Sequence, residues 1–309
     1  MSATDWARTE ERGDIRMMIL GARVLDIFGY YIGLVVATIA VFFFFVTGRS
    51  SRAGSRIYLE RLHNAHPTAV GRPNLFRIFV HHWHFAIAAM DRLMFWQGKL
   101  DKFQITTSGR EHILAKRDRG ILLIGAHMGS FDVMRAFSVE RDLPINVVMY
   151  RANAAKFNAL LEKLNPGASI RIFDLDGSDI NRVFELKEAL DRGELVALLA
   201  DRAPPYGRSR MCRVDFMGEE AGFPQNPWIL AHMLECEVFL ASGMRTGLRR
   251  YSVKVEPFAE QILLPRKTRA EDLKSYVIQY ATRLEEICAA NPYEWFNFYD
   301  FWANEPSEH

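Results

Sequence analysis

A histidine and an aspartate separated by four residues could together carry out acid–base chemistry. They lie in the stretch LLIGAHMGSFDVMRA at residues 122–136, where an apolar run ends at His127 and Asp132 follows a short turn. A histidine works as a general base when a partner on its second ring nitrogen fixes the tautomer, and a carboxylate can be that partner. Across a strand-to-helix turn this spacing can bring the two side chains together. A histidine that simply ends a strand gives the same pattern, so the motif alone leaves both interpretations open.

The turn between these residues contains Gly129 and Ser130, which we expect to contact a substrate. Ser130 is not predicted to be a nucleophile, because its surroundings lack the second glycine of a G-x-S-x-G elbow. The sequence also contains neither GxGxxG nor GxxxxGK[ST], the loops that bind phosphates. These absences argue against ordinary kinases and dinucleotide-dependent enzymes.

Three further polar residues lie where other apolar runs end. Arg151 directly follows the run at 143–150, and Asp201 and Arg202 come at the end of the run at 193–201. Ligands of parallel sheets bind at the carboxyl ends of the strands, so these side chains should face the same crevice as His127. A guanidinium there can stabilise an oxyanion or a phosphate. We therefore predict that Arg151, Asp201 and Arg202 bind substrate.

The elements that would position these residues alternate between strands and helices. Apolar strands are predicted at 120–127, 143–150, 168–175, 193–201, 236–245 and 251–258, and helices at 130–140, 154–165, 181–192, 227–235 and 269–292. This alternation predicts an α/β fold with a mixed, largely parallel sheet covered by helices. The sequence shows no internal repeat or flexible linker, so residues 49–309 are expected to form one domain.

An uncharged apolar segment, IFGYYIGLVVATIAVFFFFVTG, occupies residues 27–48 after a charged segment at 1–26. Its length matches the roughly 20 residues that cross a bilayer, and Tyr30 and Tyr31 stand near one end as interfacial aromatics do. We predict one transmembrane or membrane-embedded anchor helix, with a buried core helix as the alternative. Arginines flank the segment on both sides, so the positive-inside rule does not choose an orientation.

The remaining features exclude more than they predict. A net charge of +2 is too small to indicate nucleic-acid binding. The three cysteines are far apart without CxxC spacing, which indicates reduced thiols facing a cytosol. A helix predicted at 74–95 carries His81, His82 and His84, but no carboxylate lies at the matching helical offset. We expect these histidines to be solvated or interfacial and predict no metal site.

Taken together, the blocks resemble the bacterial late acyltransferases of lipid A biosynthesis, within the wider class of H-x4-D/E glycerolipid acyltransferases. After the apolar anchor they are, in order, GILLIGAHMGSFD, VVMYRANAAKFNALLEKL, LLADRAPPYG leading into VDFMGEEAGFPQNPWILA, and NPYEWFNFYDFW. The resemblance covers almost the whole chain. It implies that His127 is the catalytic base, that Asp132 is its partner, and that Arg151 and Arg202 contact the substrate or the oxyanion.

The resemblance also implies a reaction and its partners. An acyl chain would pass from a thioester on acyl carrier protein to a lipid hydroxyl at the cytoplasmic face of a bacterial inner membrane, without cofactor or metal. Gly218 and Pro224 would belong to the turn that shapes the acyl-chain region. The acidic carrier could dock on the basic surface formed by Arg208, Arg210 and Arg213.

Two departures from the family pattern concern the acceptor. Asp132 stands where lipid A enzymes usually have Glu, and the NPYEWFNFYDFW segment lacks the basic residues often found there. The acceptor is therefore a lipid A precursor or another lipid, such as a different glycolipid, an aminolipid or a polyene pigment lipid. A lysophospholipid acyltransferase and a non-catalytic membrane-anchored binding protein are the alternatives.

Overall fold

The computed structural model describes residues 15–114, 119–134, 144–149, 163–164, 170–174, 180–203 and 210–303. The chain forms two compact units that alternate along the sequence. One contains Met1–Leu93, Ala203–Phe223 and Val277–His309, and the other contains Met94–Arg202 and Pro224–Tyr276. We call them the helical unit and the sheet unit. Whether residues 49–309 function together as one acyltransferase domain stays a prediction.

The sheet unit is built on seven strands in the order β1-β9-β8-β2-β5-β3-β4. Their bounds are β1 Gln104–Ser108, β2 Leu122–Gly125, β3 Ile145–Met149, β4 Ile170–Asp174, β5 Leu195–Leu199, β8 Val238–Gly247 and β9 Arg250–Ala259. All neighbours pair in parallel except β8 and β9, which form an antiparallel hairpin. The predicted α/β fold with a mixed, largely parallel sheet is therefore confirmed.

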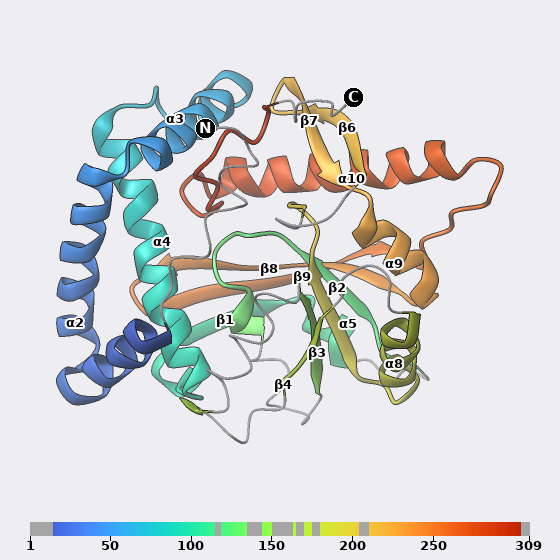
Figure 1. Cartoon of the computed structure of the whole chain (residues 1–309), viewed down its shortest axis with the longest axis horizontal. Coiled ribbons are helices and arrows are strands. Elements are labelled where there is room, and N and C mark those ends of the chain that lie inside the picture. Colours follow the sequence, from blue (N-terminus) through green and yellow to red (C-terminus); the bar gives the residue numbers. More distant parts are fainter. Residues whose placement is uncertain are drawn as a thin grey trace. The chain divides into compact units, whose positions relative to one another are not determined.

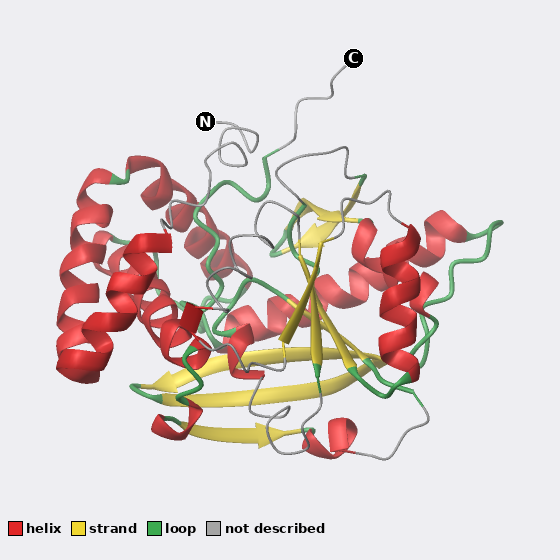
Figure 2. Ribbon diagram, turned by 60° about the horizontal axis from the view of Figure 1, so that its bottom comes forward, coloured by secondary structure: helices red, strands yellow, loops and turns green. Residues whose placement is uncertain are grey.

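Burial on both faces explains why the central strands are apolar throughout. Leu122, Leu123 and Ile124 of β2 are completely buried, as are Val196 and Ala197 of β5. Such strands need cover on two sides, which α/β crossovers provide. The sheet is strongly twisted, so that its long and short strands run in visibly different directions (Figure 2).

Two described helices of the sheet unit, α8 and α9, lie close to the helices predicted at 181–192 and 227–235. Their bounds are α5 Arg110–Leu114, α8 Ile180–Asp191 and α9 Asn226–Leu234, with 3-10 turns η1 Leu100–Lys102 and η2 Phe131–Met134. The helix predicted at 130–140 begins as η2, and its remainder lies outside the described residues. So does most of the helix predicted at 154–165.

The helical unit begins with α2, Ile15–Thr47, which starts well before the predicted anchor at 27–48. It is followed by α3, Arg49–Ala65, and α4, Leu75–Trp96 (Figure 1). The strands β6, Met211–Phe216, and β7, Glu219–Pro224, pair with each other, and both turn residues between them have positive φ. The last helix, α10, is Arg269–Ala290. The boundary between the units falls within α4 and α10.

Residues 18–47 of α2 form one helix long and apolar enough to cross a membrane. The helix is interrupted at Gly29, whose φ of 78° and ψ of 176° are not helical. Glycine alone adopts such a conformation without steric strain, so the bend is fixed by this residue.

Two of the three histidines of α4 are buried, so the expectation that they are solvated was wrong for His81 and His82, whereas His84 is part-exposed. His81 is completely buried and His82 is 6% exposed. His81 Nδ1 lies 2.8 Å from Ser55 Oγ, and its Nε2 lies 2.8 Å from the carbonyl oxygen of Trp295. Burial lowers the pKa of His81 to about 3, which keeps the ring neutral. His81 therefore fastens α4 to α3 and to the C-terminal segment.

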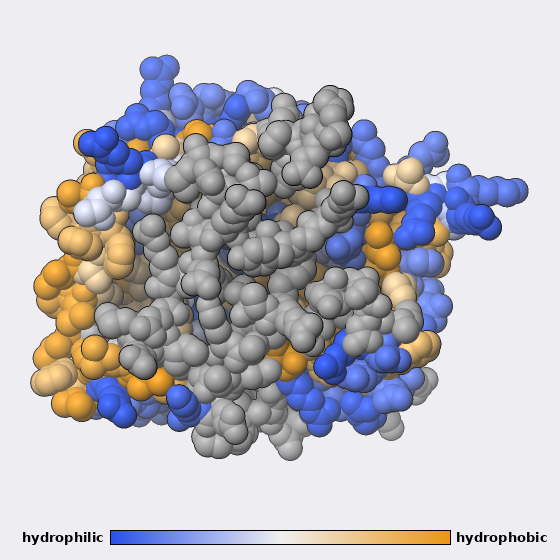
Figure 3. Space-filling model, viewed as in Figure 1, coloured by the Kyte–Doolittle hydropathy of each residue, from blue (hydrophilic) through white to orange (hydrophobic). Residues whose placement is uncertain are grey.

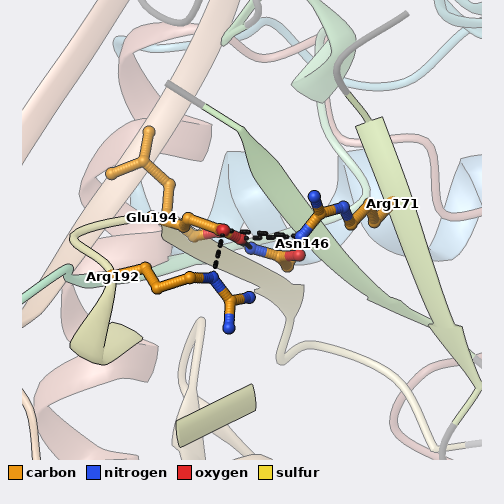
Figure 4. Close-up of polar contacts among 5 residues, drawn as sticks. Asn146, Arg171, Arg192 and Glu194 are labelled. Carbon is orange, nitrogen blue, oxygen red and sulfur yellow. Dashed lines mark hydrogen bonds and ion pairs between the residues drawn. The ribbon is translucent and has the colours of Figure 1, made fainter. Parts of the chain in front are cut away.

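A buried carboxylate ties the amino ends of three strands together (Figure 4). Glu194, immediately before β5, accepts hydrogen bonds from Asn146 Nδ2 at 2.9 Å and from Arg192 Nε at 2.7 Å. Arg171 on β4 lies 3.3 Å from the same carboxylate. Burial opposes ionisation, but the hydrogen bonds from Arg192 and Asn146 outweigh it and lower the pKa of Glu194.

Replacing Glu194 with Gln should destabilise the protein by about 1–3 kcal/mol, because the buried Asn146 amide and the part-exposed Arg192 lose a charged acceptor. The folded pKa is lowered, so this contribution is present above the usual glutamate range and is lost as the pH falls through the folded pKa. Thermal unfolding of wild type and variant should differ at neutral pH and converge in acid. Glu185→Gln is the control, since its ion pair with Arg182 is exposed and should change little. Equal melting temperatures for Glu194→Gln and wild type at neutral pH would contradict this account.

Candidate active site

Two parallel strands bring together residues that lie 74 positions apart in the chain. In the pairing of β2 with β5, Gly125 stands opposite Leu199, and Ala200 N donates a hydrogen bond to Gly125 O at 3.0 Å. His127 and Asp201 each follow two residues later. The register of the strands therefore places these two side chains next to each other at the carboxyl edge of the sheet.

One carboxylate holds His127 at two points. Asp201 Oδ1 lies 2.7 Å from His127 Nδ1, and Asp201 Oδ2 accepts the backbone N–H of His127 at 3.0 Å. An ionised carboxylate can only accept, so Nδ1 carries the proton and Nε2 keeps its lone pair. Asp201 is completely buried, whereas the His127 side chain is 40% exposed. A base directed toward an incoming molecule requires this combination.

The carboxylate of Asp201 remains ionised although it is buried. Burial alone would raise its pKa, but the interactions with His127, together with the charge of nearby Arg202, hold the pKa well below the usual range. Arg202 Nε lies 3.8 Å from Asp201 Oδ2, and its side chain is 10% exposed. A permanently charged Asp201 can therefore both orient the imidazole and stabilise its protonated form.

Asp132 lies in η2 and has a different neighbour. Its Oδ1 accepts a hydrogen bond of 2.7 Å from the indole Nε1–H of Trp96, at the end of α4. Trp96 is only 4% exposed. The nitrogen of His127 that needs an orienting carboxylate is thus bonded to Asp201, and Asp132 is bonded to Trp96. The predicted catalytic role of Asp132 stays a prediction.

The turn between His127 and η2 depends on close backbone approach. Gly129 has a φ of 53°, and Ser130 N donates a hydrogen bond of 2.8 Å to Gly243 O on β8. A Cβ atom on Gly129 would meet the Gly243 carbonyl, and one on Gly243 would meet the Ser130 carbonyl. Ser130 itself is completely buried. Its predicted contact with a substrate, like that of Gly129, remains a prediction.

The predicted arginines are found in several settings. Arg202 lies beside the pair of His127 and Asp201, as described above. Arg151, predicted to bind substrate, and Arg208, predicted to bind the carrier, lie outside the described residues. Arg210 is exposed, and Arg213 Nε lies 2.8 Å from Glu220 Oε2 in the hairpin of β6 and β7. Gly218 forms the turn of this hairpin and Pro224 ends β7.

Sequence reasoning missed two contacts. It predicted Asp201 to bind substrate and did not pair it with His127, and it did not single out Trp96. The sequence did contain a signal for the contact between His127 and Asp201. The apolar runs at 120–127 and 193–201 both end in a small residue followed by one polar residue, as GAH and LAD. The partner of Asp132 had no comparable signal, since Trp96 precedes it by 36 residues.

A part-exposed imidazole held by a buried carboxylate at the carboxyl edge of parallel strands has the geometry that a general base requires. The chain belongs to the bacterial lipid A biosynthesis acyltransferase family, whose model matches residues 16–303. The resemblance seen in the sequence is thereby confirmed over nearly the whole chain, and membership supports acyltransferase activity. No curated protein matches the chain.

Replacing Trp96 with Phe should reduce transfer on the order of tenfold, because it removes the N–H that holds Asp132 and keeps an aromatic ring. The measurement is kcat and KM for acyl transfer by purified protein. Trp302→Phe is the control, since it removes a comparable buried indole bond, to Phe216 O at 2.9 Å, in the helical unit. If both variants lost the same activity, the Trp96 bond would serve stability alone.

Proposed function

We propose that this protein transfers a fatty acyl chain from acyl carrier protein to a hydroxyl of a lipid A precursor or related glycolipid, at the cytoplasmic face of the bacterial inner membrane. The observation that carries the proposal is the 2.7 Å bond between His127 Nδ1 and Asp201, which leaves Nε2 of a part-exposed imidazole as a base. Membership of the lipid A acyltransferase family supports the reaction class.

The chemistry requires one base and no covalent enzyme intermediate. His127 Nε2 takes the proton of the acceptor hydroxyl as its oxygen attacks the thioester carbonyl. The tetrahedral oxyanion then collapses, the carbon–sulfur bond breaks, and the imidazolium returns its proton to the leaving thiolate. The products are an ester and the free thiol of the carrier. A positioned general base contributes typically 10²–10⁴-fold to such a step.

The two carboxylates have separate roles in this proposal. Asp201 orients the imidazole and stabilises the imidazolium, as its two bonds to His127 and its burial support. Asp132, held by Trp96, is the acidic residue of the H-x4-D motif and acts as a second carboxylate beside Asp201. Arg151 and Arg202 stabilise the oxyanion or bind the acceptor. The low exposure of Arg202 favours such a role, since a partly desolvated guanidinium interacts strongly with a developing charge.

Replacing His127 with Ala should leave a folded protein whose acyl transfer falls by about 10³-fold or more. Asp201→Asn should fall by a comparable factor, because the amide can hold the wrong tautomer of the imidazole. The assay is release of free thiol from acyl carrier protein, with melting temperature as the check on folding. A folded His127→Ala protein with normal activity would end the proposed mechanism.

Asp132→Asn separates the roles of the two carboxylates. If Asp201 orients His127, Asp132→Asn should be severe but milder than Asp201→Asn. The opposite order would assign the orienting role to Asp132. Mass spectrometry of the lipids in a strain that lacks the gene would identify the acceptor by the species that loses one acyl chain.

The identity of the donor can be tested on the arginines predicted to bind it. Reversing the charge of Arg208, Arg210 and Arg213 together should weaken the use of acyl carrier protein far more than the use of acyl-coenzyme A. The carrier is acidic over a protein surface that coenzyme A lacks. Exposed pairs contribute only about 0.2–1 kcal/mol each, so the triple change is the informative one.

The donor effect should appear in kcat/KM and shrink as salt rises. Glu220→Gln is a useful control, because it releases Arg213 from its ion pair without removing a positive charge. Equal loss with both donors would mean that these arginines serve the fold or the acceptor. An unchanged triple variant would mean that the carrier docks elsewhere.

A further inference from the structure

After its bend at Gly29, α2 runs beside α4 within the helical unit (Figure 1). Two contacts join the two helices: the rings of Phe45 and Phe79 at 5.3 Å between centroids, and Trp83 Nε1 donating to Thr38 Oγ1 at 3.0 Å. A third close approach is at Gly33, where a Cβ atom would lie 3.4 Å from Met90 Sδ. The residue numbers rise on one helix as they fall on the other, so the helices are antiparallel.

The spacing of these contacts shows how closely the two axes are aligned. From Gly33 to Phe45 α2 advances 12 residues, or about 18 Å, and from Phe79 to Met90 α4 advances 11 residues, or about 17 Å. Nearly equal advances mean that the helices stay side by side over this length. Any depth in a membrane reached by α2 here is therefore also reached by α4.

The same length of α4 carries a polar network on another side. His81 bonds to the Trp295 carbonyl at 2.8 Å, and His84 Nδ1 lies 2.7 Å from Glu294 Oε1. Glu294 is 2% exposed and belongs to the irregular C-terminal segment that follows α10. If α2 crossed the bilayer, it would carry this buried carboxyl group, its histidine partner and this non-helical backbone into the depth of the hydrocarbon, where such groups are costly.

Beyond the bend, the large side chains on the exposed face of α2 are apolar. Nine residues there are each 49–67% exposed: Tyr31, Ile32, Val35, Val36, Ile39, Phe42, Phe43, Phe44 and Val46. Figure 3 shows hydrophobic residues gathered along the edge where α2 lies. A patch of this kind marks a surface that is covered in the working protein.

Positive charge stands at both ends of this apolar face. Arg23 is exposed before it, and Arg49 and Arg56 on α3 are exposed after it. Because arginines flank the apolar segment at both ends, the positive-inside rule does not choose an orientation across a membrane. Both sets can meet anionic headgroups if the two ends of the segment lie at the same surface of the membrane.

We propose that α2 lies in the plane of one leaflet of a bilayer that contains anionic phospholipid, instead of crossing it. The nine apolar side chains enter the acyl-chain region, α4 and its polar network stay on the aqueous side, and both ends of α2 lie at one headgroup layer. The inference rests on the membrane association in the proposed function and specifies how the protein binds the membrane. It also places the acceptor lipid and the enzyme at the same leaflet.

The test measures the depth of single nitroxide labels on the full-length protein in vesicles of phosphatidylethanolamine and phosphatidylglycerol. Labels replace Ile32, Val36, Ile39 and Phe43 as single cysteines, and the three native cysteines are buried. In-plane binding places all four labels at one shallow depth, about 5–10 Å below the headgroups. A crossing helix gives depths that change along the chain, by about 16 Å between positions 32 and 43.

A label at the exposed position Arg283 of α10, introduced as Arg283→Cys, is the matched control and should report water throughout. Depths that change steadily along α2 would overturn the proposal, and so would four labels that all report water. Protease access to tags at the two ends of the chain gives an independent readout, because in-plane binding puts both tags on one side. Repeating the depths with His127→Ala separates this inference from the catalytic proposal, since that change should leave them unaltered.

Discussion

The pair of His127 and Asp201 depends on a feature of the backbone, the parallel register of β2 with β5. Gly125 and Leu199 lie opposite each other at the ends of the two strands, and in each segment the polar residue follows two positions later. A shift of one strand by a single residue would turn Asp201 to the other face of the sheet. The apolar interiors of both strands are completely buried, so such a shift would expose hydrophobic side chains. The hydrophobic core therefore fixes the distance between base and carboxylate.

The conformation of the turn after His127 depends on two residues that have no side chain. Gly129 and Gly243 approach so closely that a Cβ on either would collide with a carbonyl of the other segment. The hydrogen bond from Ser130 N to Gly243 O then anchors the start of η2 to β8. Asp132 and its bond to Trp96 follow from this anchoring. Glycines far apart in the sequence thus decide where an acidic side chain is placed.

Much of the fold could be predicted from the sequence, because it depends on local patterns. Continuous apolar runs gave the strands β2, β3, β4, β5, β8 and β9, and the helical period gave α4 and α10 close to their observed bounds. The pairing of His127 with Asp201 was missed: the similar ends of the two apolar runs hint at it, but choosing Asp201 as the partner requires knowing that β2 lies beside β5 and not beside β3. The burial of His81 was missed for a similar reason. Its partner, the Trp295 carbonyl, is 214 residues away.

The order of the chain has a consequence for biosynthesis. The helical unit combines residues from the first 93 positions with residues after 277. During translation α2, α3 and α4 leave the ribosome long before the segment that supplies the Trp295 carbonyl and Glu294. Until then the histidines of α4 lack these acceptors, and the contacts to be formed are of high sequence separation, which slows folding. The apolar face of α2 is complete from the start, so the nascent chain can settle on a lipid surface while the rest of its helical unit is still being made.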